Sequence, residues 1–185
     1  SDNTNLQHVF FVSSTRVYGQ KTQDLLNETT LAIPSDFGGE RLLEAEQLLK
    51  ELSCGSTVIR LSGIYGKGRQ YLMNLAKAPE RWPQSNKWTN RIHRDDAARF
   101  ITFLCEQVSA GKVVEDCYIG TDDMPTLQHD VLRWLAVQLG VTQPDLSLGG
   151  DLGGKRLSNQ RLHDVGFQLM YKNYQDGYSE MLNNV

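Results

Sequence analysis

The sequence is constrained most by two short apolar segments that flank one amphipathic segment. Residues 8–13 (HVFFVS) and 57–61 (TVIRL) are nearly continuous runs of apolar and β-branched side chains, as is typical of strands buried on both faces of a parallel sheet. Between them, residues 39–52 repeat leucine at helical spacing. Strand, helix and strand in this order predict a βαβ unit. The apolar residues expected on the buried side of the helix are Leu42, Leu43, Ala45, Leu48, Leu49 and Leu52.

The rest of the chain continues the alternation of helices and strands, without repeats or low-complexity tracts. The pattern predicts a third strand at 113–119, so the expected fold is α/β with about three parallel strands. Residues 78–93 are rich in Pro, Trp and Asn and are predicted to be irregular. Further helices are predicted at 69–76, 94–108, 125–139, 159–165 and 174–182.

Composition excludes several classes of function. The 185 residues carry a net charge of −3 and scattered basic residues, so nucleic acid is not an expected partner. The chain has neither an apolar run of about 18 residues nor a signal peptide, and we expect a cytoplasmic protein that does not enter a membrane. Its three cysteines lack metal-binding spacing, and His93 has only Asp95 and Asp96 nearby. No metal site is therefore expected, and a small molecule is the expected partner.

Small polar residues follow both strands of the βαβ unit. Ser14 and Thr15 come directly after the first strand, and Ser62 and Gly63 come after the second. Ligands of α/β sheets bind beyond the carboxyl ends of the strands. This position predicts an active site there, although the Ser14 hydroxyl could equally serve only to satisfy the backbone at a strand end.

Four segments resemble, in the right order, the second half of the extended short-chain dehydrogenases/reductases, the NAD-dependent epimerase/dehydratase group. They are VSSTRVYG (12–19), LLEAEQLL (42–49), VIRLSGIYGKGR (58–69) and NRIHRDDAARF (90–100), and NQRLHDVGF (159–167) resembles the closing helix of that group. The resemblance implies NAD or NADP as the cofactor. It also implies a partial doubly wound, Rossmann-like parallel sheet with a helical C-terminal cap on the substrate side.

The resemblance divides residues 1–185 into a sheet portion (1–66) and a mostly substrate-side region with one more strand (67–185). The family's opening strand, glycine-rich turn and helix, which hold the dinucleotide pyrophosphate, have no counterpart here. The glycine cluster at 149–154 follows no predicted strand and is expected to be a flexible connection. The chain is therefore expected to be a C-terminal half that by itself binds a dinucleotide only weakly.

The family's catalytic Tyr, which is followed four positions later by a Lys, is also absent. At that spacing this chain has Phe37 and Arg41, or Gly38 and Leu42 in the alternative register. Neither pair supplies a phenol, and an arginine does not titrate in the relevant pH range. The resemblance therefore implies either an atypical enzyme of this family with a degenerate Tyr-x-x-x-Lys motif, or a protein that has lost the reaction.

The resemblance assigns roles to individual residues. Ser14 matches the catalytic Ser/Thr, Thr15 is a lesser candidate for the same role, and Tyr18 is either a replacement acid or a packing residue. Arg41 is expected to hold ribose or phosphate oxygens. Ser62 and Gly63 lie where the backbone approaches the nicotinamide.

Four further residues are expected to contact the substrate. Tyr65 and Arg69 begin the substrate-side loop, and Trp88 and Asn90 lie in the family's substrate segment. Arg69 could clamp a phosphate or carboxylate, or be an ordinary surface residue. Trp88 could contact a sugar or nucleoside, or be a packing anchor.

Two functions remain open at this point. One is an NAD(P)-dependent epimerase, dehydratase or reductase acting on a nucleotide-sugar-like or other hydroxyl/carbonyl substrate. The other is a non-catalytic dinucleotide-binding sensor or scaffold that retains the fold. In either case the apolar strand 8–13 is expected to present an unpaired edge and to promote self-association.

Overall fold

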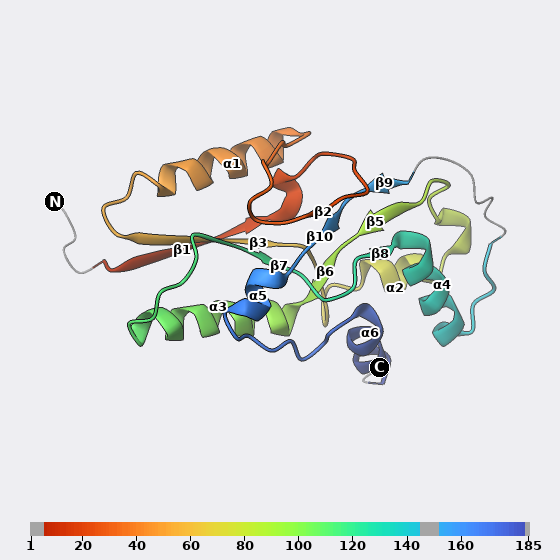
Figure 1. The fold of residues 1–185 in the computed structure, drawn as a ribbon. Coiled ribbons are helices and arrows are strands. Elements are labelled where there is room, and N and C mark those ends of the chain that lie inside the picture. Colours follow the sequence, from red (N-terminus) through yellow and green to blue (C-terminus); the bar gives the residue numbers. More distant parts are fainter. Residues whose placement is uncertain (1–5, 145–151, 184–185) are drawn as a thin grey trace.

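A computed structural model describes residues 6–144 and 152–183 (Figure 1). Its main sheet has three strands in the order β1–β3–β7, and neighbouring strands are parallel. Strand β1 is His8–Ser14, β3 is Gly55–Leu61 and β7 is Cys117–Gly120. The predicted α/β fold with about three parallel strands is therefore confirmed.

Two helices cover opposite faces of this sheet (Figure 1). Helix α1 (Phe37–Leu49) connects β1 to β3, and α3 (Arg94–Ser109) precedes β7. Successive side chains of β3 alternate between the two helices, as the pleat requires. Arg60 bonds to α1, whereas Ile59 and Leu61 belong to the apolar cluster that α3 covers.

The side of α1 that faces the sheet differs from the predicted leucine face. Leu42 and Leu43 are partly buried there, but the side chains of Leu48 and Leu52 are 63% and 40% exposed. The most deeply buried side chain of the helix is Glu46, which is 3% exposed. The prediction was therefore wrong for Leu48 and Leu52, while Leu42, Leu43, Ala45 and Leu49 are partly buried. It also missed Glu46, because periodicity cannot reveal that a carboxylate has a partner on the sheet.

Strand β1 is an edge strand among the described residues, and it pairs only with β3. None of its apolar side chains is buried, and Val12 is 47% exposed. The expectation that this strand is buried on both faces is thus wrong for this structure, in which its apolar side chains are only partly covered by the elements packed on the sheet. The expected open edge is present in the described part of the chain.

The remaining elements are helices and short strands outside the main sheet. The predicted helices are present, with ends that differ by at most three residues. They and the short strands are η1 Thr15–Val17, β2 Leu25–Leu26, β4 Gly63–Tyr65, α2 Tyr71–Ala76, η2 Pro79–Arg81, β5 Lys87–Thr89, β6 Arg91–His93, β8 Thr126–Leu127, α4 Gln128–Leu139, β9 Gly153–Gly154, β10 Arg156–Leu157, α5 Gln160–Asp164 and α6 Tyr174–Asn183.

The short strands form three small sheets that the sequence pattern did not predict. They pair as β10–β2, β4–β6 and β8–β5–β9. Thr126 and Leu127 pair with β5, so α4 begins at Gln128 and not at the predicted Pro125. The third main strand begins at Cys117 rather than Val113, whose side chain is 96% exposed.

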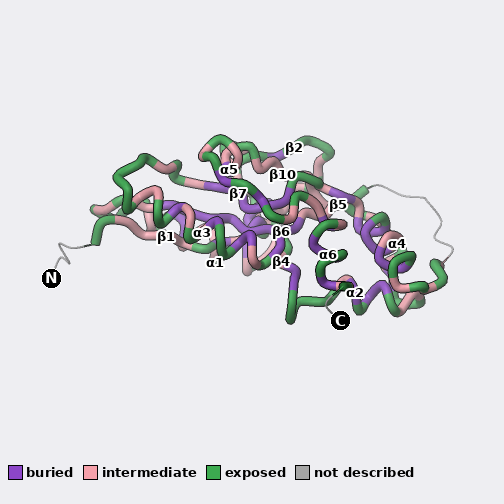
Figure 2. Tube along the Cα trace, turned by 90° about the horizontal axis from the view of Figure 1, so that it is seen from below, coloured by how far each residue is buried: buried purple, intermediate pink, exposed green. Residues whose placement is uncertain are grey.

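A second apolar core lies beyond these small sheets. Helices α2, α4 and α6 pack around it, and Trp82, 3% exposed, donates its indole N–H to the Leu75 carbonyl at 3.0 Å. Figure 2 shows buried segments around β4 and β6 and again in α4. No helix in the described ranges is long and apolar enough to cross a membrane.

Part of the glycine cluster at 149–154 is ordered. Residues 149–151 lie outside the described residues, but Gly153 and Gly154 form β9, which runs parallel to Lys87 and Trp88. A Cβ on Gly154 would lie 2.2 Å from the Trp88 carbonyl oxygen, and its φ is +81°. Glycine is needed here for close backbone approach, so the prediction of a flexible connection is wrong at 153–154.

Candidate active site at the strand ends

The carboxyl ends of the main strands meet at one edge of the sheet. Ser14 pairs in register with Leu61, and Leu61 pairs with Gly120, so the residues that follow β1 and β3 are neighbours. The Ser14 Oγ caps η1 by accepting a hydrogen bond from the Arg16 N–H at 3.2 Å. Because this bond uses only an acceptor site, the hydroxyl proton of Ser14 can still be donated. Thr15, 8% exposed, is buried beside it.

The end of β3 approaches a second strand closely. The Gly63 N–H donates to the Asn90 carbonyl at 3.2 Å, and a Cβ on Gly63 would lie 3.1 Å from that oxygen. Ser62 is 6% exposed, and its backbone N–H donates to the Gly120 carbonyl. Its buried Oγ has no hydrogen-bond partner among the described residues. An unpaired buried hydroxyl is costly, so this oxygen is available to a further polar group.

Tyr18 belongs to a buried polar network on the α1 face. Glu46 accepts a hydrogen bond from Ser13 at 2.6 Å and pairs with Arg60, also at 2.6 Å. The Tyr18 hydroxyl accepts from Arg60 at 2.5 Å and donates to the Asn27 carbonyl at 3.1 Å. Burial raises the pKa of Tyr18 to about 12. The Tyr18 phenol is fully buried, makes two hydrogen bonds and has a raised pKa. These properties suit a side chain that stabilises the fold.

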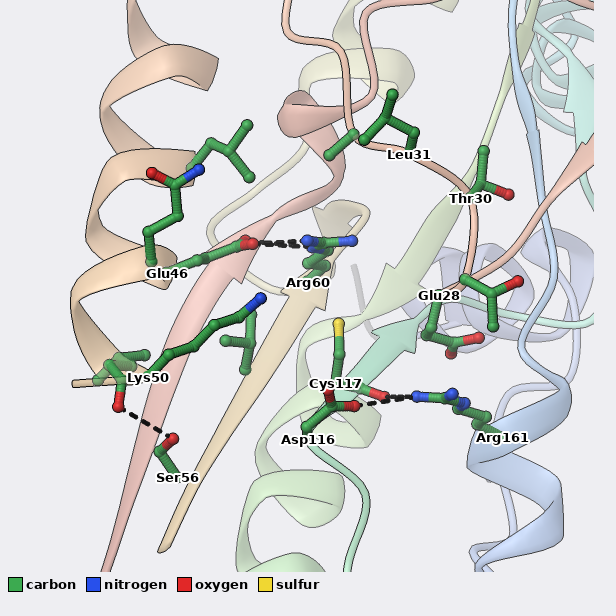
Figure 3. A pocket seen from close by; sticks show the side chains of 16 residues that line it. Glu28, Thr30, Leu31, Glu46, Lys50, Ser56, Arg60, Asp116, Cys117 and Arg161 are labelled. Atoms are coloured by element: carbon green, nitrogen blue, oxygen red, sulfur yellow. Dashed lines mark hydrogen bonds and ion pairs between the residues drawn. The ribbon is translucent and has the colours of Figure 1, made fainter. Parts of the chain in front are cut away.

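A cavity of about 650 Å³ adjoins this network, between α1 and α5 (Figure 3). Lys50 extends into the cavity (Figure 3). Four other charged side chains of the lining are already paired, Glu46 with Arg60 and Arg161 with Asp116 at 3.3 Å. The cavity lies on the α1 face of the sheet and includes neither Ser14 nor any predicted substrate residue. We therefore place the candidate active site at the strand ends and not in this larger cavity.

Arg41 lies at the exposed start of α1. Its guanidinium is 4.9 Å from the centre of the Phe37 ring and 2.6 Å from the Glu44 carboxylate. Phe37 itself is 69% exposed. The guanidinium thus interacts with its own helix, and the first of the two possible registers places an exposed phenyl ring where the family has its phenol.

Most of the predicted substrate residues do come together. Gly63, Tyr65, Arg69 and Asn90 line one cavity of about 230 Å³, which we call the substrate-side pocket. Tyr65 is 4% exposed, and burial raises its pKa far above the usual range. The pocket opens beside the end of β3, so it adjoins the candidate reacting centre.

Trp88 and Asn90 are engaged by the chain itself. The Trp88 indole N–H donates to Gln23 at 2.9 Å, and the Arg156 guanidinium lies 5.1 Å from its ring. The Asn90 amide donates to the Lys155 carbonyl at 2.8 Å and accepts from the Leu157 N–H at 2.9 Å. Trp88 does not line the pocket, and Asn90 lines it while it also holds β10 in place.

Sequence reasoning missed Arg91 and Asp122, which are buried beside the pocket. Arg91 is 3% exposed and donates to the Thr89 hydroxyl at 2.5 Å. Asp122 is 1% exposed, and burial raises the pKa of its carboxyl to about 7 despite the nearby Arg91. The sequence carried no signal for this cluster, because Arg91 lies in the segment 78–93 that is predicted to be irregular and its strand β6 has only the residues Arg, Ile and His.

The residues present fit one end of a nicotinamide dinucleotide and not the other. Ser14, Ser62 and Gly63 offer hydroxyls and close backbone approach at the strand ends. The N-terminus of α1 is instead occupied by its own cap, since the Asp36 carboxylate accepts from the Gly39 N–H at 2.9 Å. Helix α3 carries two acidic residues in its first turn. Neither helix offers a site for pyrophosphate.

The described residues contain no group of three or more His, Cys, Asp or Glu side chains that could hold a metal ion.

Comparison with known proteins points to one family. A Methylobacillus flagellatus protein that has itself only been assigned as an NAD-dependent epimerase/dehydratase is 50% identical, with a TM-score of 0.91 over 97% of this chain and 64% of that one. No protein-family model and no curated protein matches.

More distant structures share the fold alone. A human epimerase-family protein solved with NADPH is 17% identical, with a TM-score of 0.78 over 97% of this chain and 66% of its own. A dTDP-glucose 4,6-dehydratase from Bacillus anthracis solved with NAD is 17% identical, with a TM-score of 0.74 over 94% and 60%. The chain thus spans less than two thirds of the length of each of these proteins.

Proposed function

We propose that this chain, which is 50% identical to a protein assigned as an NAD-dependent epimerase/dehydratase, supplies the substrate side of an NAD- or NADP-dependent reaction at a hydroxyl or carbonyl group. In this proposal residues 1–185 correspond to the C-terminal half of the domain and act together with a dinucleotide-binding half. All three cysteines are unpaired, which supports a cytoplasmic location.

The proposal rests on the juxtaposition of the β1 and β3 ends with the substrate-side pocket. When bound, the nicotinamide would supply the hydride acceptor or donor. Ser14 would donate a hydrogen bond from its hydroxyl to the reacting oxygen and so orient the substrate. Gly63 would let the substrate lie against the backbone between the strand ends and the pocket.

A second function is favoured by one observation at the start of α1. Arg41 lies over the exposed Phe37 ring and pairs with Glu44, so the usual phenol and its lysine partner are both missing. This arrangement suits a dinucleotide-binding sensor or scaffold that has no proton donor for the reaction.

Replacing Ser14 with alanine tests the enzymatic proposal in a protein that also carries the dinucleotide-binding half. We expect single-turnover hydride transfer, followed by the absorbance of the bound nicotinamide, to slow by about 10²-fold, since one oriented hydrogen bond to the reacting oxygen is lost. Ser109→Ala, at the exposed end of α3, is the matched control. If no hydroxyl or carbonyl compound changes the absorbance in the unaltered protein, the sensor function stands instead.

The 185-residue chain alone is expected to bind NAD or NADP with a Kd weaker than about 1 mM. The physical reason is that the α1 N-terminus is already capped by Asp36, so the pyrophosphate has no positively polarised N–H groups to meet. Isothermal titration calorimetry measures this directly. Micromolar binding would contradict both this prediction and the proposed need for a second half.

We also propose that the chain self-associates through the open edge of β1. Replacing the half-exposed Val12 with lysine is expected to shift the chain toward monomer in sedimentation experiments, because a charge on an edge strand opposes edge-to-edge pairing. The control is Val137→Lys, since Val137 lies on α4 and is 62% exposed. An unaltered chain that sediments as a monomer at micromolar concentration would refute the proposal.

A further inference from the structure

The substrate-side pocket has an unusual distribution of charge. Its lining includes three basic residues, Arg69, Lys87 and Arg91, and no acidic residue. None of the three takes part in an ion pair with a described residue, although ten such pairs occur elsewhere in that part of the chain. The three basic side chains of the pocket therefore lack an ion-pair partner in the described chain, and the buried carboxylate that interacts with Arg91 at longer range is Asp122.

Arg91 is the basic residue for which this matters most, because it is 3% exposed. Its Nη2 donates to Thr89, and its guanidinium lies 5.4 Å from the centre of the Tyr174 ring. Its Nη1 is buried and has no hydrogen-bond partner among the described residues. A buried guanidinium without a carboxylate partner is energetically costly, and such groups are normally paired.

Asp122 does not supply the missing partner. Its Oδ1 accepts from the Met124 N–H at 3.1 Å, and its buried Oδ2 has no hydrogen-bond partner in the described chain. The two side chains form no ion pair, although the positive charge of Arg91 acts to lower the pKa of Asp122 against the larger effect of burial. The buried Oε1 of Gln128, which also lines the pocket, is likewise unpartnered among the described residues. Of these unsatisfied atoms, only the Arg91 Nη1 can donate a hydrogen bond to an anionic group, whereas the oxygens of Asp122 and Gln128 can accept from a hydroxyl of the same ligand.

The size and walls of the pocket limit what this ligand can be. A volume of about 230 Å³ is below the roughly 300–1,000 Å³ of sites that take drug-sized molecules. Tyr65, Tyr71 and Tyr178 supply aromatic walls, and Ile64 and Leu72 supply aliphatic ones. The pocket is therefore suited to a short carbon skeleton that carries an anionic group, and it is too small for a nucleotide diphosphate.

We propose that the substrate-side pocket binds the carboxylate or phosphate of a small substrate through Arg91, with Lys87 and Arg69 at its rim. The inference rests on the proposed function for the reaction that follows, since the neighbouring hydroxyl or carbonyl of the same molecule would be the reacting group. The binding step depends only on the chain described here. This proposal restricts the substrate class to small molecules that carry an oxyanion group, and it excludes nucleotide sugars.

Thermal unfolding and calorimetry of the 185-residue chain test the proposal, with inorganic phosphate and acetate as separate probes. Sodium chloride at matched ionic strength is the control for general salt effects. We expect saturable binding of at least one probe and a rise in the unfolding midpoint with its concentration. The probe with the higher affinity identifies the headgroup as phosphate or carboxylate.

Arg91→Gln is expected to weaken that binding by about tenfold or more, because a charge-assisted hydrogen bond is lost. Arg133→Gln is the matched control, since Arg133 lies on α4 outside the pocket and pairs with Asp130. If Arg91→Gln does not fold, Lys87→Gln tests the proposal instead. Lys87 is exposed, so this variant is expected to stay folded and to bind the probe more weakly.

The proposal is overturned if neither probe stabilises the chain more than chloride does. It is also overturned if both pocket variants bind as tightly as the unaltered chain. Its failure is separable from that of the proposed function, which is read from nicotinamide absorbance in the longer protein. Anion binding without hydride transfer would leave the pocket assignment intact and favour the sensor.

Discussion

Replacing Glu46 with glutamine is expected to lower the free energy of unfolding by about 3–5 kcal/mol. Glu46 is 3% exposed, bonds to Ser13 and pairs with Arg60 at 2.6 Å. The substitution keeps the shape of the side chain but leaves the buried Arg60 guanidinium without a counter-charge. Urea denaturation measures the change, which would be a large part of the stability of an ordinary domain.

The exposed pair of Arg41 and Glu44 provides the control for this experiment. It has the same N–O distance of 2.6 Å, but its side chains are 59% and 55% exposed. Glu44→Gln is therefore expected to change stability by about 1 kcal/mol or less. Equal effects of Glu46→Gln and Glu44→Gln would mean that the buried network does not hold α1 against β3.

The second large effect is expected at Asp122, as a dependence of stability on pH. Burial raises the pKa of its carboxyl from 3.8 to about 7 in the folded chain. Because the folded state binds this proton more tightly than the unfolded state, the stabilising contribution is fully present below about pH 4. It is lost as the pH rises from there through 7, and the total is about 4 kcal/mol.

Asp122→Asn is expected to remove this pH dependence and to make the chain more stable than the unaltered one at pH 8. Asparagine cannot ionise, and its amide oxygen can still accept the hydrogen bond that Asp122 accepts from Met124. Urea denaturation between pH 4 and pH 8 is the measurement. Asp130→Asn, at a 48%-exposed carboxylate on α4, serves as control. An unchanged pH profile for Asp122→Asn would refute the assignment.

The sequence alone was sufficient to predict the βαβ unit and the edge of the sheet where Ser14 and Ser62 meet. Long apolar runs and leucine at helical spacing are local signals, and the carboxyl ends of parallel strands necessarily share one edge. The resemblance to the epimerase/dehydratase family followed from short segments in order, and the 50% identical relative supports it. Four of the predicted cofactor and substrate residues, Gly63, Tyr65, Arg69 and Asn90, line a common pocket.

The small sheets depend on partners that are distant in sequence. Strand β5 lies between β8 and β9, which begin 39 and 66 residues after its own first residue, Lys87. Two-residue strands carry no periodicity, so nothing local distinguishes them from loops. The close approach that requires glycine at 154 became evident only with Trp88 against it.

The two buried polar clusters were likewise decided by tertiary structure. Glu46 lies among leucines in its helix, and Arg91 lies in a segment that is predicted to be irregular, so the sequence pattern assigns neither side chain a buried position or a partner. Packing joins Glu46 to Arg60, whereas it leaves Arg91 without a carboxylate. Hydrophobic periodicity determines which segments are buried because it is a property of neighbouring residues. Whether a buried charge is paired, or is free to bind a ligand, depends on atoms that only the folded chain brings together.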